Sequence, residues 1–211
     1  MRRLLAVAVP ALLLAGADST SGLVGRWKSA EVSPANLSAV FEFGRDGVVD
    51  SYSSVIVEGR YRLLGTDTII LQSKDGHEEK QELEWDNQDR GRIEDEAAGK
   101  SIEISRAGKR LDPQNPLLGE WDTTREWSGK RYPARGLFFA DGRNIWIINL
   151  RVETGRYSVK DGRIRLEIPD RPAIEGNFSV AEGSLMLPNP RGGQSRFNQL
   201  DSDYLAPANR R

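Results

Sequence analysis

The chain has 211 residues, with 30 Lys and Arg against 31 Asp and Glu, one His, no Cys and 38% hydrophobic residues. This length can form one large β domain or two small domains, and the near-neutral charge excludes a polycationic nucleic-acid-binding protein. Without Cys the chain has no disulfide, thiolate nucleophile or Cys-ligated metal centre, and a single His removes paired-His metal sites. We therefore expect a protein that uses no cofactor or metal and binds no nucleic acid.

Residues 1–17 have the three-part pattern of a secretory signal peptide. Arg2 and Arg3 precede the apolar run Leu4–Leu14, and Ala15–Ala17 supplies the small residues of a cleavage site. The apolar run is shorter than the ~20 residues of a membrane-spanning helix, and as a buried helix it would have no amphipathic face. We expect cleavage at the end of this segment, export to the periplasm or the extracellular space, and no stable membrane insertion afterwards. An exported chain without Cys is typical of bacteria.

The rest of the chain contains one pattern written twice, at an offset of about 95 residues. Four landmarks recur in the same order: Leu23–Trp27 as Leu117–Trp121, Phe41–Gly47 as Phe138–Gly142, Val57–Tyr61 as Val152–Tyr157, and Ile69–Leu71 as Ile164–Leu166. Four landmarks that keep their order with so little drift indicate an internal duplication.

Between the landmarks, polar and apolar residues alternate with a period of two, as in Arg163–Ile168 and Ser101–Ile104. This period is typical of half-buried antiparallel strands. Asp-Gly pairs, such as Asp46–Gly47 and Asp141–Gly142, separate the strands and favour tight hairpins. The spacing predicts about eight short strands in each repeat and almost no helix.

Closing such a meander into a barrel removes both of its sheet edges. We therefore predict an all-β fold of two tandem antiparallel β-barrels, residues 18–107 and 117–205. The Pro-containing polar segment 108–116 is the expected linker, and residues 206–211 form a tail. One larger closed sheet built from both halves is the alternative. We expect the protein to be a monomer.

A Gly-x-Trp sequence that opens a strand meander resembles the start of lipocalins, members of the calycin superfamily. In that family the Trp covers the closed end of the barrel, and an Arg from the last strand packs on the indole ring. The matching residues are Gly25 with Trp27, Gly119 with Trp121, and Arg106 as the last-strand Arg. The repeats are shorter than lipocalins and resemble small lipocalin-like domains of bacterial envelope proteins. The same five residues also have a purely structural role, as a turn, an apolar plug and a cation–π contact.

Two motifs that suggest chemistry do not complete a site. His77 follows a hairpin turn, and the chain has no Gly-x-Ser-x-Gly nucleophile motif to accompany it. Asp86–Gly91 is similar to a calcium-binding loop, but Arg90 occupies a ligand position and Ala97 stands where the twelfth-position Glu belongs. We therefore predict no catalytic residue and no enzyme activity.

Three aromatic residues outside the plugs, near the first two hairpins of the second repeat, are candidate ligand contacts. They are Trp127, where a barrel mouth would be, Tyr132, and Trp146, which is either core or a ligand platform. The leading hypothesis is a non-enzymatic exported protein whose lipocalin-like barrels bind a small apolar or amphipathic ligand. The alternative is an envelope scaffold or an inhibitor-like interaction module, with filled barrels and a protein partner in the envelope. An enclosed interior pocket favours the first hypothesis, and a packed interior favours the second.

Overall fold

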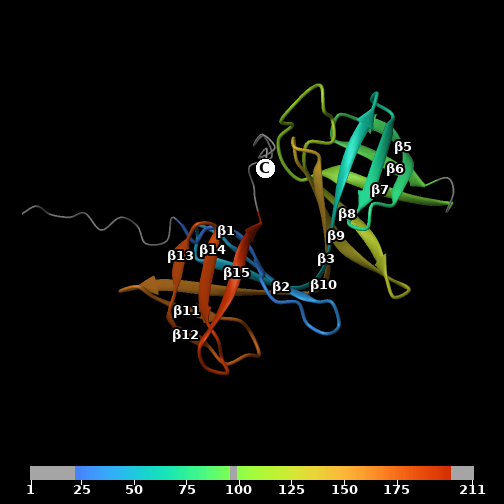
Figure 1. Cartoon of the computed structure of the whole chain (residues 1–211). Helices are drawn as coiled ribbons and strands as arrows, with labels where there is room; N and C mark the ends of the chain where they lie inside the picture. Colours follow the sequence, from blue (N-terminus) through green and yellow to red (C-terminus); the bar gives the residue numbers. More distant parts are fainter. Residues whose placement is uncertain (1–21, 96–98, 201–211) are drawn as a thin grey trace, which may run out of the picture.

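The computed structural model describes residues 22–95 and 99–200 of the chain (Figure 1). The expected signal peptide and tail lie outside these residues. Every regular element that the structure describes is a strand, and all strand pairs are antiparallel, which confirms the all-β prediction. The strands are β1 (Gly25–Ser29), β2 (Ser38–Phe43), β3 (Val48–Leu64), β4 (Thr68–Ser73), β5 (Glu78–Asn87), β6 (Arg90–Asp95), β7 (Lys100–Arg106), β8 (Gly119–Trp127), β9 (Lys130–Phe138), β10 (Arg143–Lys160), β11 (Arg163–Glu167), β12 (Ile174–Asn177), β13 (Ser179–Ala181), β14 (Ser184–Pro188) and β15 (Gln194–Leu200).

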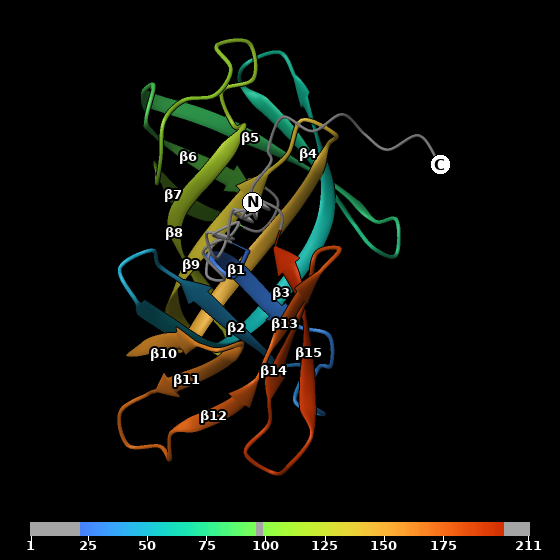
Figure 2. The same ribbon diagram turned by 90° about the vertical axis from the view of Figure 1, so that its left-hand side faces the viewer.

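The strands form one 15-stranded sheet, in the order β12-β11-β10-β9-β8-β7-β6-β5-β4-β3-β2-β1-β15-β14-β13. An additional pairing of β10 with β3 closes the eight strands β3–β10 into a ring. These two strands are the longest, at 17 and 18 residues, and they pair from Arg60 opposite Arg143 to Val48 opposite Arg156. Only one half of each lies in the ring, because the other halves continue into a second group of strands (Figures 1 and 2).

The molecule therefore has two lobes. The ring lobe contains β4–β9 with the adjoining halves of β3 and β10, and the open lobe contains β1, β2 and β11–β15 with the other halves. In Figure 2 the ring lobe lies above the open lobe, with β3 and β10 passing between them. Apolar residues of both repeats, among them Val40, Leu137, Ile147 and Leu200, form a further cluster that is separate from the core of either lobe.

Each lobe is built from both repeats, which corrects the expectation of one barrel per repeat. The last strand of the first repeat, β7, pairs with the first strand of the second repeat, β8. In the same way, β1 pairs with β15, the last strand of the second repeat. A repeat that closed on itself would pair β1 with β7 and β8 with β15. The expected linker 108–116 therefore connects neighbouring strands of one lobe, and the alternative of one sheet built from both halves is closer to the observed arrangement.

The two cores are mixed in the same way. In the ring lobe, the buried cluster combines Tyr61, Ile69, Leu83, Ile93 and Ile104 of the first repeat with Leu117, Trp121, Phe138 and Trp146 of the second. In the open lobe, it combines Leu23, Trp27, Phe41, Phe43 and Val49 with Tyr157, Ile164, Leu166, Ile168, Leu185, Leu187 and Phe197. Because hydrophobic burial is the main stabilising contribution, neither repeat buries its apolar residues without the other.

The turns and one glycine of each repeat follow from the sequence. The Gly of all four Asp-Gly pairs, Gly47, Gly76, Gly142 and Gly162, has a positive φ, as the hairpin prediction requires. In the Gly-Arg-Tyr landmarks, a Cβ on Gly59 would collide with the carbonyl oxygen of Gln72, and a Cβ on Gly155 with that of Glu167. These two glycines therefore let neighbouring strands approach β3 and β10 closely.

Candidate functional site

The two Gly-x-Trp tryptophans, predicted as barrel plugs, are fully buried core residues. Trp27 and Trp121 are both 0% exposed, Trp27 in the core of the open lobe and Trp121 in that of the ring lobe. Each indole N–H donates a hydrogen bond to a backbone carbonyl four residues earlier, on Leu23 at 2.8 Å and on Leu117 at 2.7 Å. With its one polar group satisfied, each indole fills a lobe as apolar volume.

Arg106 packs on a Trp, but on that of the other repeat. Its guanidinium carbon lies 4.2 Å from the centre of the Trp121 ring, and the side chain is 1% exposed. It donates hydrogen bonds to the carbonyl oxygens of Pro116 and Leu118 and pairs with Asp89 at 3.0 Å. Burial holds the pKa of Arg106 below its ordinary value, against the opposing effect of Asp89. This contact of Arg106 follows directly from the pairing of β7 with β8.

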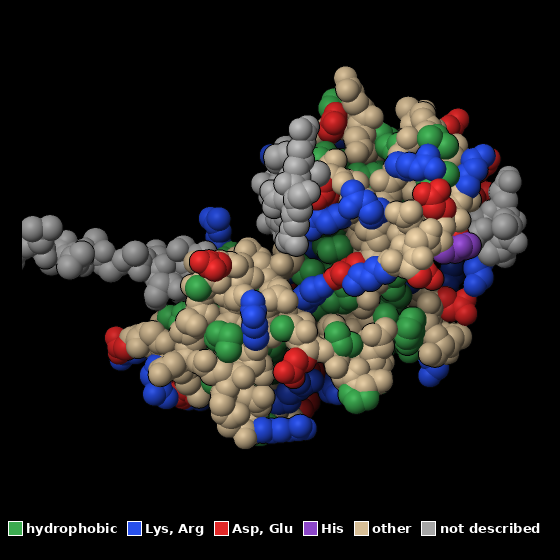
Figure 3. Space-filling view, viewed as in Figure 1, with side chains coloured by type: hydrophobic (Ala, Val, Ile, Leu, Met, Phe, Trp, Pro, Cys, Tyr) green, Lys and Arg blue, Asp and Glu red, His purple; other side chains and the backbone are tan. Residues whose placement is uncertain are grey.

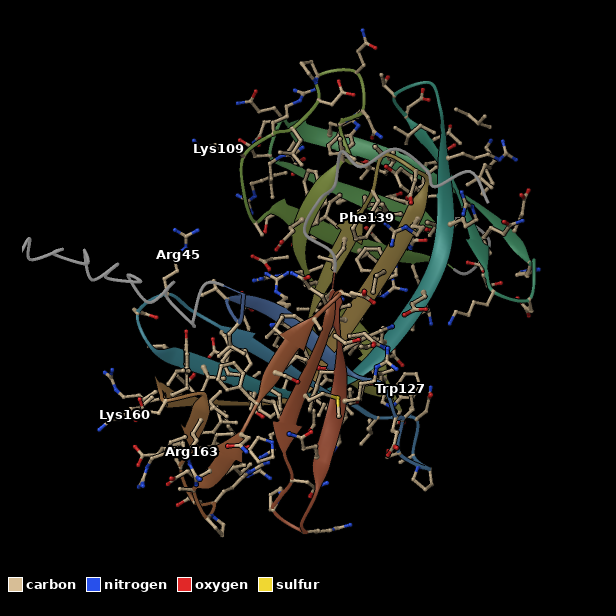
Figure 4. The ribbon with its side chains drawn as sticks, turned by 60° about the vertical axis from the view of Figure 1, so that its left-hand side comes forward. Arg45, Lys109, Trp127, Phe139, Lys160 and Arg163 are labelled. Carbon is tan, nitrogen blue, oxygen red and sulfur yellow. The ribbon has the colours of Figure 1, made fainter. Side chains whose placement is uncertain are left out.

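The three candidate ligand contacts separate into two groups. Trp146 is 3% exposed, in edge-to-face contact with Phe138 and with its ring against Gly136, so it belongs to the core of the ring lobe. Trp127 and Tyr132 are half-buried and pack together on a small neighbouring cluster. In Figure 4, Trp127 and Lys109 lie at opposite ends of the ring lobe. The buried cluster fills the interior of this lobe, and no hollow reported below is lined by any of these three aromatic residues.

A hollow of about 460 Å³ lies where the two lobes meet, and we call it the junction cleft. In the space-filling view, Lys and Arg side chains gather between the lobes (Figure 3). The residues lining this cleft come from β1, β3, β4, β10 and β15, with the turn that follows β4, and so from both repeats: Lys28, Glu58, Gly59, Arg60, Gln72, Ser73, Lys74, Gly76, Arg143, Asn144, Ile145, Gln199 and Leu200.

The lining has four cationic side chains and one carboxylate, Glu58. Lys28 and Lys74 both pair with this carboxylate, the second at 2.8 Å. Burial would raise the pKa of Glu58, but the two ammonium groups outweigh this effect and lower it. Arg60 donates a hydrogen bond to the carbonyl oxygen of Asp141 at 2.8 Å, and Arg143 pairs with the carboxylate of Asp141 at 2.6 Å. Four cationic side chains thus stand against two carboxylates, which leaves the cleft with an excess of positive charge.

The floor of the cleft contains a buried polar group without a partner. Asn144 is 5% exposed, and its side-chain carbonyl oxygen accepts no hydrogen bond. The backbone of Gly59 lies directly beside this oxygen. Leaving a buried acceptor unsatisfied costs about 1–3 kcal/mol, so a donor group that entered the cleft would find a favourable partner. Ile145 and Leu200 add apolar surface to the lining.

Groupings that suggest metal or nucleophilic chemistry do not occur among residues 22–95 and 99–200. Within this part of the chain, no three His, Asp or Glu side chains lie together as metal ligands would. The side chain of His77 is 69% exposed, and its Nε2 lies 3.7 Å from a carboxylate oxygen of Glu79. The described residues also include no helix that is long and apolar enough to span a membrane.

Comparisons of the chain with protein families, with curated proteins and with solved structures find no match. The residues of the junction cleft are therefore the main guide to function. Sequence reasoning missed this cleft, because its residues are distant in sequence and only the exchange of strands between repeats brings them together. The Asn144 side chain carried one usable signal, since it is a polar residue within the apolar run of β10.

Proposed function

We propose that this chain is a non-enzymatic binding protein that holds a small amphipathic anion in the junction cleft. The observation that carries the proposal is the excess of cationic side chains: Lys28, Arg60, Lys74 and Arg143 line the cleft, against Glu58 in the lining and Asp141, which pairs with Arg143. Cationic walls around a partly apolar hollow attract an anion from solution and favour a ligand that also has apolar surface.

The polar groups of the cleft define what the ligand should contain. An anionic group would lie near the exposed Lys74 and Arg60, where it can form charge-assisted hydrogen bonds. An N–H or O–H donor of the ligand would reach the unpartnered oxygen of Asn144. Its apolar part would cover Ile145 and Leu200. This ligand is more polar than the barrel interior of a lipocalin would select, and the difference reflects a site between lobes and not within one.

We also propose that the protein is exported and that it is distantly related to lipocalin-like domains. The amino-terminal pattern supports export, and the buried Trp121 with Arg106 on its ring supports a distant relation to lipocalin-like domains. In this interpretation the ancestral repeat is a small lipocalin-like unit, and the present chain joins two units that have exchanged strands.

A pair of fluorescent probes tests the function. The probe 8-anilinonaphthalene-1-sulfonate is an amphipathic anion, and N-phenyl-1-naphthylamine has the same aromatic skeleton without the charge. We expect the anion to bind the full chain more tightly, and its affinity to fall as salt is raised from low to physiological concentration. Lys74→Gln and Arg60→Gln should each weaken binding about two- to fivefold, the range for exposed charge contacts.

Matched variants provide the control. Lys109 and Lys160 are exposed and outside the lining of the cleft, so Lys109→Gln and Lys160→Gln should leave affinity for the anionic probe unchanged. Circular dichroism of each variant verifies that its fold is intact. Equal binding of the neutral and anionic probes, or equal losses in the control variants, would overturn the proposal.

A further inference from the structure

The ring lobe has an incomplete seam between β7 and β8, two strands that do not line the junction cleft. These strands pair only from Ile104 opposite Thr123 to Arg106 opposite Trp121. The remainder of β7, residues 100–103, pairs with β6 alone, and residues 124–127 of β8 pair with β9 alone. Over this stretch the facing edges of β7 and β8 are not paired with each other. One side-chain contact crosses between them, a hydrogen bond from the Thr123 hydroxyl to the Glu103 carbonyl.

A hollow of about 490 Å³ occupies this seam, and we call it the strand gap. Three consecutive residues of each strand line it, Lys100–Ile102 and Thr124–Glu126. A hollow on one face of a sheet is lined by every second residue, because successive side chains point to opposite faces. Lining by consecutive residues therefore shows that the strand gap extends into the plane of the sheet between β7 and β8, where a further strand would lie. Glu79 and Gln81 of β5 line its inner side, toward the interior of the ring.

Two polar groups in the strand gap lack the partners that their burial calls for. Gln81 is 7% exposed, and its side-chain carbonyl oxygen accepts no hydrogen bond, while its amide donates to Glu79 at 3.4 Å. The half-buried guanidinium of Arg125 lies 4.9 Å from the centre of the Trp146 ring. Glu79, which lines the same hollow, attracts this guanidinium but forms no direct ion pair with it. The site thus offers one buried acceptor and one cation with unused donors.

The charges around the strand gap select the occupant. Lys100, Arg125 and Arg131 line it against Glu79 and Glu126, an excess of one positive charge. Arg125 shares the inner face of the ring with Trp146, whereas Glu126 alternates to the outer face. In an added strand paired with β8, the residue opposite Arg125 points inward as well, because directly opposed residues share a face. An acidic residue fits this inner position, and basic residues fit the two outer positions beside it.

We propose that the strand gap is a second binding site, beyond the proposed function of the junction cleft, which takes an extended peptide segment with one inward-facing acidic residue as an added strand between β7 and β8. An inward-facing carboxylate of the peptide accepts hydrogen bonds from Arg125. The Oε1 atom of Gln81 accepts one from a donor of the peptide. The peptide backbone pairs with the free edges, so a segment antiparallel to β8 runs parallel to β7.

The test uses the full chain and a blocked five-residue peptide, acetyl-Thr-Lys-Glu-Lys-Thr-amide, measured by titration calorimetry. A peptide with Gln in place of Glu should bind about 10- to 100-fold more weakly, the loss expected for a charge-assisted hydrogen bond. The same peptide with N-methylated backbone amides should not bind, because it cannot pair with a strand. Arg125→Gln should reproduce the loss, whereas Arg163→Gln, in the open lobe, should not.

Amide hydrogen exchange and sedimentation complete the test. Binding should protect backbone amides in 100–103 and 124–127, and Gln81→Met should weaken it in a chain whose melting curve is unchanged. Equal binding of the N-methylated peptide, or no new protection on these edges, would overturn strand addition. Self-association of the chain that Arg125→Gln abolishes would also overturn the proposal, because a second copy would then be the occupant. Neither result bears on probe binding in the junction cleft.

Discussion

The ring lobe and the open lobe share the same end structure but close in different ways. In the ring lobe, Tyr61 meets Phe138 edge to face at 5.0 Å and donates its hydroxyl to the carbonyl of Phe139. In the open lobe, Tyr157 meets Phe43 at the same distance and donates to the carbonyl of Gly44. Each of these contacts joins one repeat to the other. The duplicated landmarks therefore encode reciprocal contacts between repeats.

The two lobes differ in whether strand pairing closes the sheet on itself. Hydrogen-bonded strand pairs run all the way round the ring lobe, although the β7–β8 seam is short. In the open lobe no strand pairing joins β12 to β13, and side chains cover the seam, with Gly176 against Pro188 and Gln194 donating to the carbonyl of Asn177. A buried Trp and a filled core are therefore common to both lobes, whereas strand pairing completes the circuit only in the ring lobe.

The largest effect should come from separating the repeats. Residues 22–107 expressed alone, or 117–200 alone, should fail to fold, because each would expose half of two cores. Mixing the two fragments should restore the native circular dichroism spectrum and a cooperative melt. Cleavage at a protease site placed in 108–116 should leave the two pieces associated in size-exclusion chromatography. A fragment that folds alone as a stable monomer would contradict the exchange.

Truncating the plugs should come next. Trp27→Ala and Trp121→Ala should each lower the free energy of unfolding by about 3–5 kcal/mol, as loss of a buried aromatic does. We expect the larger loss at Trp121, which also carries Arg106 and contacts Trp85 at 5.7 Å between ring centres. Urea denaturation monitored by circular dichroism measures both. A larger loss at Trp27 would show that the stacked Arg adds little.

Tyr61 and Tyr157, at equivalent positions of the two repeats, differ by one hydrogen bond. Tyr157→Phe should lower the free energy of unfolding by about 0.5–1.5 kcal/mol, because it removes the hydrogen bond that the Tyr157 hydroxyl donates to Gly44 of the other repeat. Tyr61→Phe should cost more, since Asn115 also donates to the Tyr61 hydroxyl at 3.0 Å and would lose its acceptor. Equal losses in urea denaturation would mean that the bond from Asn115 contributes nothing.

The smallest effect should be the acid dependence from Glu58, between the lobes. Its pKa is lower in the folded chain, so the unfolded chain binds a proton more readily. The ionised Glu58 therefore adds about 0.2–1 kcal/mol to the free energy of unfolding when the pH is above its unfolded pKa of about 4.3. This stabilisation is lost as the pH falls through the lower pKa that Glu58 has in the folded chain. Glu58→Gln should reduce the difference in urea midpoint between pH 7 and pH 3. An unchanged difference would assign the acid sensitivity to other carboxyl groups.

The sequence predicts the local structure well, for physical reasons. The period-two alternation and the Asp-Gly pairs are signals carried by neighbouring residues. Strands form where residues alternate, and the glycines of the Asp-Gly pairs have a positive φ. The described residues form fifteen strands, where about sixteen short ones were expected, and Val48–Leu64 and Arg143–Lys160 each run as one long strand. Polar and apolar residues continue to alternate through Gly59. The local sequence therefore contains no signal that β3 passes from one lobe to the other.

The partners of the strands could not be predicted. Because the repeats carry equivalent landmarks, β1 has the same complementary pattern toward the last strand of either repeat. Arg106 suits Trp27 and Trp121 equally well as far as residue type shows, and only the structure places it on Trp121. Alternation alone does not show which face of Arg143–Ile148 lies inside, so the sequence does not decide whether Trp146 is core or a ligand contact. The junction cleft depends on the pairing between repeats and could not be predicted for that reason.

The most direct test of the exchange is an engineered disulfide, which a chain without native Cys makes unambiguous. Lys28 lies opposite Asn198 across β1 and β15, and directly opposed positions have the Cα separation that a disulfide requires. The exchange predicts that the Lys28→Cys, Asn198→Cys chain oxidises to an intramolecular disulfide and remains monomeric, with its native spectrum. In separately closed repeats, Lys28 would face Ser105 instead, the residue that here pairs with Asp122. Efficient closure of the Lys28→Cys, Ser105→Cys chain, with failure of the first, would contradict the account.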